Sequence, residues 1–124
     1  MVDVANVMGA RPDGWWRDRA GAALRLSREV TALARVDSAA QWVLVLEGRA
    51  RDAVPLLELQ PPVRVVSAPA SGDDAIVEVV VASVARDESC LVVTADRELR
   101  RRCEDHGAAV VGPGWLLGRL QGAP

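Results

Sequence analysis

Acidic residues recur at three places where strands would end or helices would begin. Asp3 lies in the opening apolar run Val2–Val7, Asp96 follows another apolar run, and Asp73 and Asp74 start a helical pattern. If the runs are parallel strands, all of these carboxylates meet at the carboxyl edge of one sheet. Carboxylates repel each other unless a cation holds them, and Mg²⁺ or Mn²⁺ prefers oxygen ligands. The pattern therefore predicts a metal-dependent site for phosphoryl transfer.

Each carboxylate also has a structural interpretation. Asp is rarely buried unless it is paired or metal-bound, so Asp3 is either a ligand or a structural hydrogen-bond acceptor. Ser71 and Asp74 fit a helix-capping pattern, which makes Asp74 a cap or a second ligand, whereas Asp73 shares a helix face with apolar residues. Asp96 could also be a helix cap. We expect Asp3, Asp73 and Asp96 to be metal ligands.

Other polar side chains are candidates for contacts around this site. Asn6 could orient a carboxylate or bond the turn at Gly9, and Glu47 could extend the acidic cluster. Arg19 is expected on the inward face of the first helix, where it would anchor a phosphate or form a salt bridge with the acids. Arg49 is a weaker candidate for the same role.

Two adjacent tryptophans follow a glycine-containing loop over the proposed site. Trp16 is expected in the core, while Trp15 either packs under the loop or stacks on a base of a single-stranded nucleic acid. The four arginines between residues 97 and 102 form either a solvated helix face or a patch that contacts a nucleic-acid backbone.

Short valine-rich runs predict the strands that position these residues. The runs are Val2–Val7, Trp42–Leu46, Val63–Val66, Leu91–Thr94 and Ala109–Val111. Helical segments lie between them: a long helix that includes Trp16, then Ala50–Leu57, Asp73–Ala85, Asp96–His106 and Trp115–Leu120. The helical periodicity predicts that Val84 and His106 face inward, together with the apolar residues of the same helices.

The alternation of strands and helices predicts an α/β fold, a three-layer α/β/α sandwich around a mostly parallel five-stranded sheet of order 3-2-1-4-5. Ligands bind to such sheets at the point where the strand order reverses. In this order the reversal lies between the first and fourth strands, which carry Asp3 and Asp96. Residues 1–120 are expected to form a single domain, followed by a frayed tail at 121–124.

Composition sets broad limits on the function. Hydrophobic residues make up 50% of the chain, the formal net charge is −2, and every basic residue other than the single His is arginine. No apolar run is long enough for a membrane span, so a cytoplasmic protein with no membrane partner is expected. Cys90 and Cys103 are expected to be reduced, buried thiols.

These motifs resemble those of the PIN-like nuclease superfamily, and within it the NYN branch. The resemblance rests on the segments 2–7, 72–77 and 92–97, and it covers nearly the whole chain. It implies a cluster of acids that binds Mg²⁺ or Mn²⁺. It also implies hydrolysis of RNA, often single-stranded, by a water molecule that the metal activates. It also implies that Asp3, Asp73 and Asp96 are metal ligands, that Asp74 is a further one, and that Asn6 supports them. Val4 stands where the first motif commonly has glycine.

Three functions stay open at this level. The expected one is a metal-dependent ribonuclease acting on single-stranded RNA. The same cluster could instead hydrolyse a small nucleotide such as a nucleoside triphosphate, or the domain could be a non-catalytic binding or regulatory module. A homodimer, which could build a longer groove, also stays open.

Overall fold

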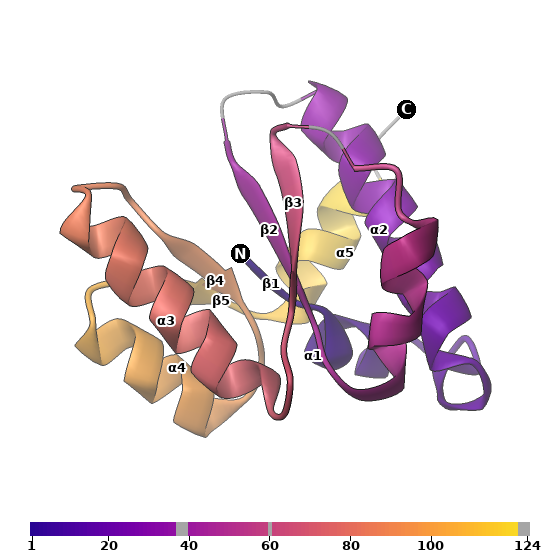
Figure 1. Cartoon of the computed structure of the whole chain (residues 1–124). Coiled ribbons are helices and arrows are strands. Elements are labelled where there is room, and N and C mark those ends of the chain that lie inside the picture. The colour runs from indigo at the N-terminus through magenta and orange to yellow at the C-terminus, as the bar shows by residue number, and fades with distance from the viewer. Residues whose placement is uncertain (37–39, 60, 122–124) are drawn as a thin grey trace.

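The computed structural model describes residues 1–36, 40–59 and 61–121, which form a parallel five-stranded sheet between two layers of helices (Figure 1). The strand order β3-β2-β1-β4-β5 confirms the predicted order. The strands are β1 (Val2–Asp3), β2 (Trp42–Leu46), β3 (Val63–Ser67), β4 (Leu91–Val93) and β5 (Ala109–Val111). The helices are α1 (Val4–Gly9), α2 (Arg19–Val36), α3 (Gly72–Ala85), α4 (Arg97–Asp105) and α5 (Pro113–Gln121), with 3-10 helices η1 (Trp15–Arg17) and η2 (Gly48–Leu56).

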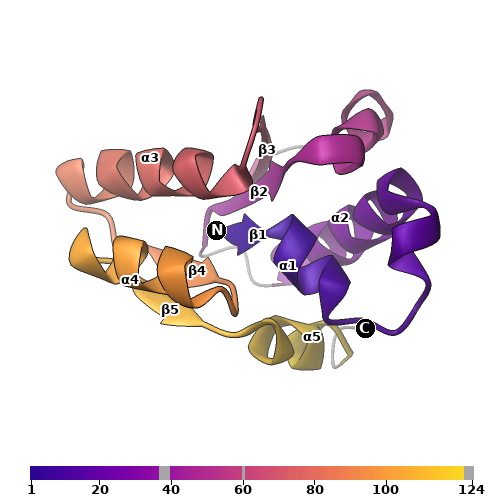
Figure 2. The same cartoon turned by 90° about the horizontal axis from the view of Figure 1, so that it is seen from below.

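Helices cover both faces of the sheet (Figure 2), and each face carries its own hydrophobic cluster. Because successive strand residues point to opposite faces, Leu44 of β2 packs with α2 and α5, whereas Val43 and Val45 pack with α3 and α4. Leu26 fills the first cluster and Ile76 the second, and both are fully buried or nearly so. Burial on both faces explains why the strands are almost purely apolar.

The first strand is much shorter than predicted. The run Val2–Val7 was expected to be one strand, but β1 ends at Asp3 and the chain enters α1 at Val4. Val4, Val7 and Met8 are buried at the spacing of one helix face. A strand assignment beyond Asp3 is therefore wrong, because a short apolar run fits a buried strand and a buried helix face equally well.

The beginning of the long helix also differs from the prediction. Residues 15–17 form the separate 3-10 helix η1, and Asp18, with a φ of −150°, interrupts the chain before α2 begins. The helical periodicity of α2 therefore does not extend back to Trp16, whose side chain is 55% exposed instead of buried. Arg19, expected on the inward face, is exposed as well.

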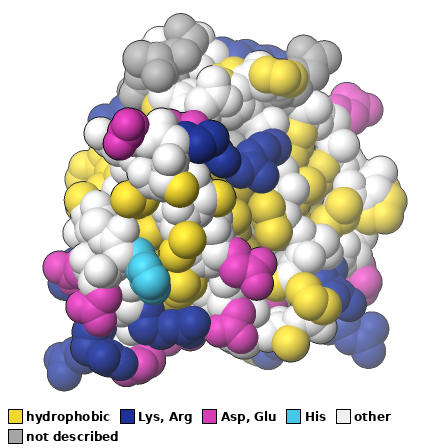
Figure 3. Space-filling view, turned by 60° about the vertical axis from the view of Figure 1, so that its left-hand side comes forward, with side chains coloured by type: hydrophobic (Ala, Val, Ile, Leu, Met, Phe, Trp, Pro, Cys, Tyr) yellow, Lys and Arg dark blue, Asp and Glu magenta, His cyan; other side chains and the backbone are white. Residues whose placement is uncertain are grey.

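The prediction that Val84 and His106, near the ends of their helices, face inward is also wrong. Val84 is 37% exposed near the end of α3. His106 is exposed because α4 ends at Asp105 and His106 is its C-cap. In the space-filling view that brings α3 and α4 forward, charged side chains of both signs lie among exposed hydrophobic ones (Figure 3).

The remaining sequence expectations concern the chain end, the membrane and the thiols. Gln121, expected in a frayed tail, is the last residue of α5, and residues 122–124 lie outside the described part. No helix among the described residues is long and apolar enough to cross a bilayer. Cys103 is buried, and its burial raises the pKa of the thiol to about 11, whereas Cys90 is half-buried.

The packing of α3 on the sheet predicts unequal effects of two substitutions in that helix. Ile76→Ala removes a fully buried side chain and should lower the free energy of unfolding by about 2–5 kcal/mol. The matched variant Val81→Ala, at a side chain that is 44% exposed, should stay within about 1 kcal/mol of the parent. Chemical denaturation measures both, and equal losses would contradict this assignment of the buried face.

Candidate functional site

Acidic side chains from the ends of three strands and from the start of one helix gather at the carboxyl edge of the sheet, the edge viewed in Figure 2. Asp3 ends β1, Glu47 directly follows β2, and Asp96 lies in the loop after β4. Asp73 belongs to the first turn of α3, which begins at the same edge. The parallel register pairs Asp3 with Val45, so Asp3 and Glu47 belong to neighbouring strand ends. This gathering is the one that the strand order implies.

Asp3 is only 7% exposed and is held on both of its oxygens. The Thr94 hydroxyl donates to Oδ2 at 2.9 Å, and the backbone N–H of Asn6 donates to Oδ1 at 3.4 Å. The second bond makes Asp3 the N-cap of α1. Thr94 also accepts a bond from the Asp96 backbone N–H at 3.2 Å, so this buried hydroxyl links two of the predicted ligands.

Asn6 makes two hydrogen bonds at this edge, one through its backbone N–H and one through its side chain. Its side-chain Oδ1 accepts a hydrogen bond of 2.7 Å from the backbone N–H of Ala95. The Asn6 side chain therefore positions the loop that carries Asp96, while its backbone N–H bonds the Asp3 carboxylate; within the described residues the side chain bonds neither a carboxylate nor the turn at Gly9. The sequence signal was a polar residue in an apolar run, but the partner lies 89 residues away.

Glu47 joins the strand β2 to the start of α3. Its Oε2 accepts a hydrogen bond from the backbone N–H of Gly72, one of the amides that a helix leaves unpaired at its first turn. A Cβ atom at Gly72 would lie 3.3 Å from Oε2 of Glu47 and 3.7 Å from a methyl group of Val45. Glycine thus allows the helix start to lie against the strand end. The hydroxyl of Ser71 caps the same helix through the N–H of Asp73 at 3.2 Å.

The two adjacent acids of α3 point to different surroundings. Asp73 is half-buried, and the charges of Asp96 and Glu47 act on it. Asp74 is exposed and forms an ion pair with Arg102 of α4 at 2.9 Å. The neighbouring acids therefore have separate roles, with Asp73 facing the carboxylate cluster and Asp74 joining the two helices.

The site has a strongly negative local field. Burial raises the pKa of Asp3 to about 6, its bonds with Thr94 and Asn6 oppose the change, and the charges of Glu47 and Asp73 add to it. Burial also raises the pKa of Asp73, followed by the charges of Asp96 and Glu47. The N-termini of α3 and α4 partly offset this field, because the positive end of a helix dipole favours nearby anions. Oδ1 of Asp96 caps α4 through the N–H of Leu99 at 3.0 Å.

The proposed substrate contacts are less centrally placed than expected. Arg19 lies over the ring of Trp15, with its guanidinium carbon 5.5 Å from the ring centroid. No ion pair joins Arg19 to a carboxylate in the described part of the chain. Trp15 is half-buried against the core, and the exposed ring of this segment is that of Trp16, with Arg17 5.8 Å from its centroid.

Two other arginines lie next to the acids along the chain. Arg49 is two residues after Glu47 in η2, and Arg97 directly follows Asp96 in the first turn of α4. Both are exposed, and neither has an ion pair or side-chain hydrogen bond within the residues that the structure covers. Arg101 and Arg102 are instead paired with Glu98 and Asp74.

Val4 does not enter the site. Its side chain is fully buried, with 0% of its surface accessible to solvent, and it belongs to the hydrophobic cluster that packs with α2. Val4 therefore fills the interior behind Asp3. The two residues whose importance was least evident from sequence are Thr94 and Glu47, since both act through hydrogen bonds with distant segments.

The donor set fits a hard divalent cation, because Asp3, Glu47, Asp73 and Asp96 all offer carboxylate oxygens. Oδ2 of Asp96 and Oε1 of Glu47 make no hydrogen bond with any described residue, so each acid keeps one oxygen for a ligand. Within residues 1–36, 40–59 and 61–121, however, no three or more His, Cys, Asp or Glu side chains are arranged so that they could hold a metal ion together.

Comparisons of the chain with protein-family models, with curated proteins and with solved structures give no match. The function is therefore inferred from the residues of the site.

The burial of Asp3 predicts a pH-dependent stability when divalent cations are removed with a chelator. The folded protein keeps the Asp3 proton up to about pH 6, whereas the unfolded chain loses it near the ordinary value of 3.8. The folded state binds more protons between these values, so the Asp3 contribution to the free energy of unfolding falls as pH rises through this range. The total fall attributable to Asp3 is about 3 kcal/mol.

Asp3→Asn cannot ionise and should not show this fall. Denaturation of both proteins from about pH 4 to about pH 7 measures the difference, which should grow in favour of the variant. Parallel pH profiles for the two proteins would contradict the assigned burial of the Asp3 charge.

Proposed function

We propose that the protein is a metal-dependent hydrolase of phosphodiester bonds, of the NYN type within the PIN-like nucleases, that cleaves single-stranded RNA. The observation that carries the proposal is the nearly buried Asp3, whose pKa is raised by burial first and then by the charges of Glu47 and Asp73. Mutually repelling carboxylates around a buried one are costly in a protein without a cation. Perturbed groups of this kind are typical of functional sites.

Asp3, Asp73 and Asp96 would hold Mg²⁺ or Mn²⁺, with Glu47 as a fourth donor. Asp74 is a weaker candidate, because its carboxylate is paired with Arg102. When bound, the ion would lower the pKa of a water molecule and neutralise charge on the phosphate. Thr94 and Asn6 act as positioning residues, since their hydrogen bonds fix Asp3 and the loop that carries Asp96.

Arg49 and Arg97 are the better candidates for binding the scissile phosphate. Both guanidinium groups are exposed beside an acid of the site and are free to form the paired hydrogen bonds that arginine makes with phosphate. Arg19, by contrast, is stacked on Trp15. Fixed cations beside a phosphate stabilise the charge that develops as the bond breaks.

The exposed ring of Trp16 favours a polymeric substrate over a free nucleotide. The segment that carries η1 lies at the same end of the molecule as the start of α4, on the far side of α1 (Figures 1 and 2). The six residues of α1 span about 9 Å. A base that stacks on Trp16 would therefore belong to a different nucleotide of the RNA from the one that carries the scissile phosphate.

The first experiment measures hydrolysis of labelled single-stranded RNAs and of nucleoside triphosphates with Mn²⁺ or Mg²⁺. Asp96→Asn and Asp73→Asn should each lower the rate by at least about 100-fold, because each removes a charged ligand of the cation. Asp105→Asn, at the far end of α4, is the matched control and should keep the parent rate.

The outcomes of that experiment separate the three functions. Cleavage of triphosphates but not of RNA would replace the ribonuclease with a nucleotide hydrolase. Folded protein that binds the cation and cleaves neither substrate would favour a non-catalytic module. Equal loss of activity in Asp96→Asn and Asp105→Asn would contradict the assignment of the site.

Base stacking on Trp16 predicts a loss of RNA affinity without a loss of folding. In the Asp96→Asn background, Trp16→Ala should weaken binding of a single-stranded RNA by about tenfold or more, and Trp16→Phe should restore part of it. Leu56→Ala removes a side chain that is similarly exposed and should leave the affinity unchanged. Fluorescence anisotropy of a labelled RNA measures these affinities, and equal effects of both alanine substitutions would exclude stacking.

A further inference from the structure

The strand β3 forms one edge of the sheet, and no strand within residues 1–36, 40–59 and 61–121 pairs with its outer side. Its neighbour in the sheet is β2, and β5 forms the opposite edge (Figure 2). An open edge readily binds a further strand, so proteins usually protect such edges with charged side chains, prolines, bulges or covering segments. The two edges of this sheet differ in that protection.

The hydrogen bonds with β2 show which backbone groups of β3 point outward. The N–H of Trp42 donates to the carbonyl of Pro62 at 2.6 Å. At the other end, the N–H of Ala68 donates to the carbonyl of Leu46 at 2.8 Å. The backbone groups of successive strand residues point to opposite sides. The N–H and C=O groups that point away from β2 are therefore those of residues 63, 65 and 67.

These outward groups make no hydrogen bond with any described residue. They belong to Val63, Val65 and Ser67. None of the three residues is proline, glycine or charged, and the two valines are β-branched and favour a strand. The outer side of β3 can therefore pair along its whole length.

The opposite edge is protected by an arginine of α4. Ala109 and Val111 are bonded to the segment of β4, so the backbone groups of Val110 point outward. The carbonyl of Val110 accepts a long hydrogen bond of 3.5 Å from Nη2 of Arg100. A charged side chain thus lies against the short outer side of β5, and no such contact is made to β3 in the part of the chain that the structure describes.

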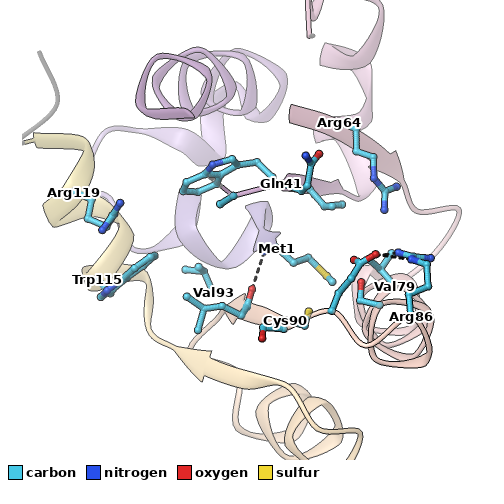
Figure 4. A pocket seen from close by; sticks show the side chains of 16 residues that line it. Met1, Gln41, Arg64, Val79, Arg86, Cys90, Val93, Trp115 and Arg119 are labelled. Carbon is cyan, nitrogen blue, oxygen red and sulfur yellow. Dashed lines mark hydrogen bonds and ion pairs between the residues drawn. The ribbon is translucent and has the colours of Figure 1, made fainter. Parts of the chain in front are cut away.

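The charged residue of β3 does not protect its outer side. Arg64 points toward Arg86 and Val79, with which it lines a cavity of about 730 Å³ (Figure 4). The pKa of Glu88 is lowered, first by its hydrogen bond with Arg86 and also by the charge of Arg64. The side chain of Arg64 therefore lies on the α3 face of the sheet, and its backbone groups point to β2.

The sequence of β3 is complementary to a second copy of itself in one antiparallel register. With Val65 opposite Val65 of the second copy, Val63 lies opposite Ser67, and all outward groups meet in hydrogen-bonded pairs. Arg64 then lies opposite Val66. The neighbouring register, with Val63 opposite Val65, would place Arg64 opposite Arg64, and like charges directly opposite each other destabilise a sheet.

Prolines disfavour the register shifted in the other direction. Pro61 and Pro69 lie two residues before Val63 and two residues after Ser67, and neither has an N–H to donate. A register with Val65 opposite Ser67 would bring Val63 opposite Pro69 and lose a donor at each end. The register centred on Val65 avoids this loss and the repulsion between arginines.

We propose that the outer side of β3 pairs with β3 of a second copy of the chain, antiparallel and centred on Val65, so that the two sheets become one. The same residues of both copies form this contact, which closes with two chains. The half-buried side chains of Val65 and Val66 would lose further contact with water. Because the paired strands run in opposite directions, the two acidic edges would lie at opposite ends and share no groove.

Sedimentation velocity over a range of protein concentrations tests the proposal. Val65→Pro removes an outward N–H and leaves the bonds with β2, a change that edge strands tolerate, so the dimer should weaken by at least about tenfold. Val110→Pro makes the same change at the outward position of β5 and should leave the dissociation constant unchanged. A chain that stays monomeric up to about 1 mM would overturn the proposal. A dimer that Val65→Pro does not weaken, or that both prolines weaken equally, would also overturn it.

Two substitutions of Val66 test the register. Val66→Glu places a carboxylate opposite Arg64 of the second copy, whereas Val66→Arg places a like charge there. Both variants lose the same half-buried valine, but Val66→Glu should dimerise at least about fivefold more tightly than Val66→Arg. Equal affinities would refute the register. Asp96→Asn should dimerise like the parent, so failure of the hydrolase proposal would leave these results unchanged.

Discussion

The central strand ends at Asp3, and that early end determines much of the remaining architecture. Asp3 is the last residue of β1, and its buried carboxylate caps α1, so the helix begins directly where the strand ends. The same carboxylate is bonded to Thr94, which fixes the end of the neighbouring strand β4. The early end of one strand thus accounts for an acidic site at the carboxyl edge of the sheet.

The acidic edge combines costly and compensating interactions. A buried carboxylate is expensive because it loses water, and neighbouring acids increase that cost. Hydrogen bonds from Thr94 and Asn6 to Asp3, from Gly72 to Glu47 and from Leu99 to Asp96 recover part of it. These donors are mostly backbone amides of helix first turns, which have no partners inside their own helices. The carboxylates therefore accept hydrogen bonds from the unpaired amides of the helix starts. In the proposed function, a bound cation would offset the repulsion that remains between the carboxylates.

The sheet order and most element boundaries could be predicted because valine-rich runs and turn residues alternate regularly. The end of β1 could not, since Val4 and Val7 fit a strand and a helix face alike. Trp16 and Arg19 were placed inward by continuing one helical periodicity through Asp18, where the backbone leaves the helical region. The predicted carboxylates Asp3, Asp73 and Asp96 do meet at one edge, because parallel topology dictates it. The supporting roles of Glu47 and Asn6 depend on contacts between distant segments, which local pattern does not reveal.

The long separation between bonded partners has a consequence for synthesis on the ribosome. Asp3 and Thr94 are 91 residues apart, and Asn6 and Ala95 are 89 apart. Because chains emerge from the amino terminus, β1 is made before both of its neighbours, and the second of these, β4, is complete only once Val93 has been added. Such non-local pairings slow folding, since a long loop has to close before any contact compensates for its lost entropy. The acids of the nascent chain therefore stay dispersed at least until β4 and Asp96 have been made.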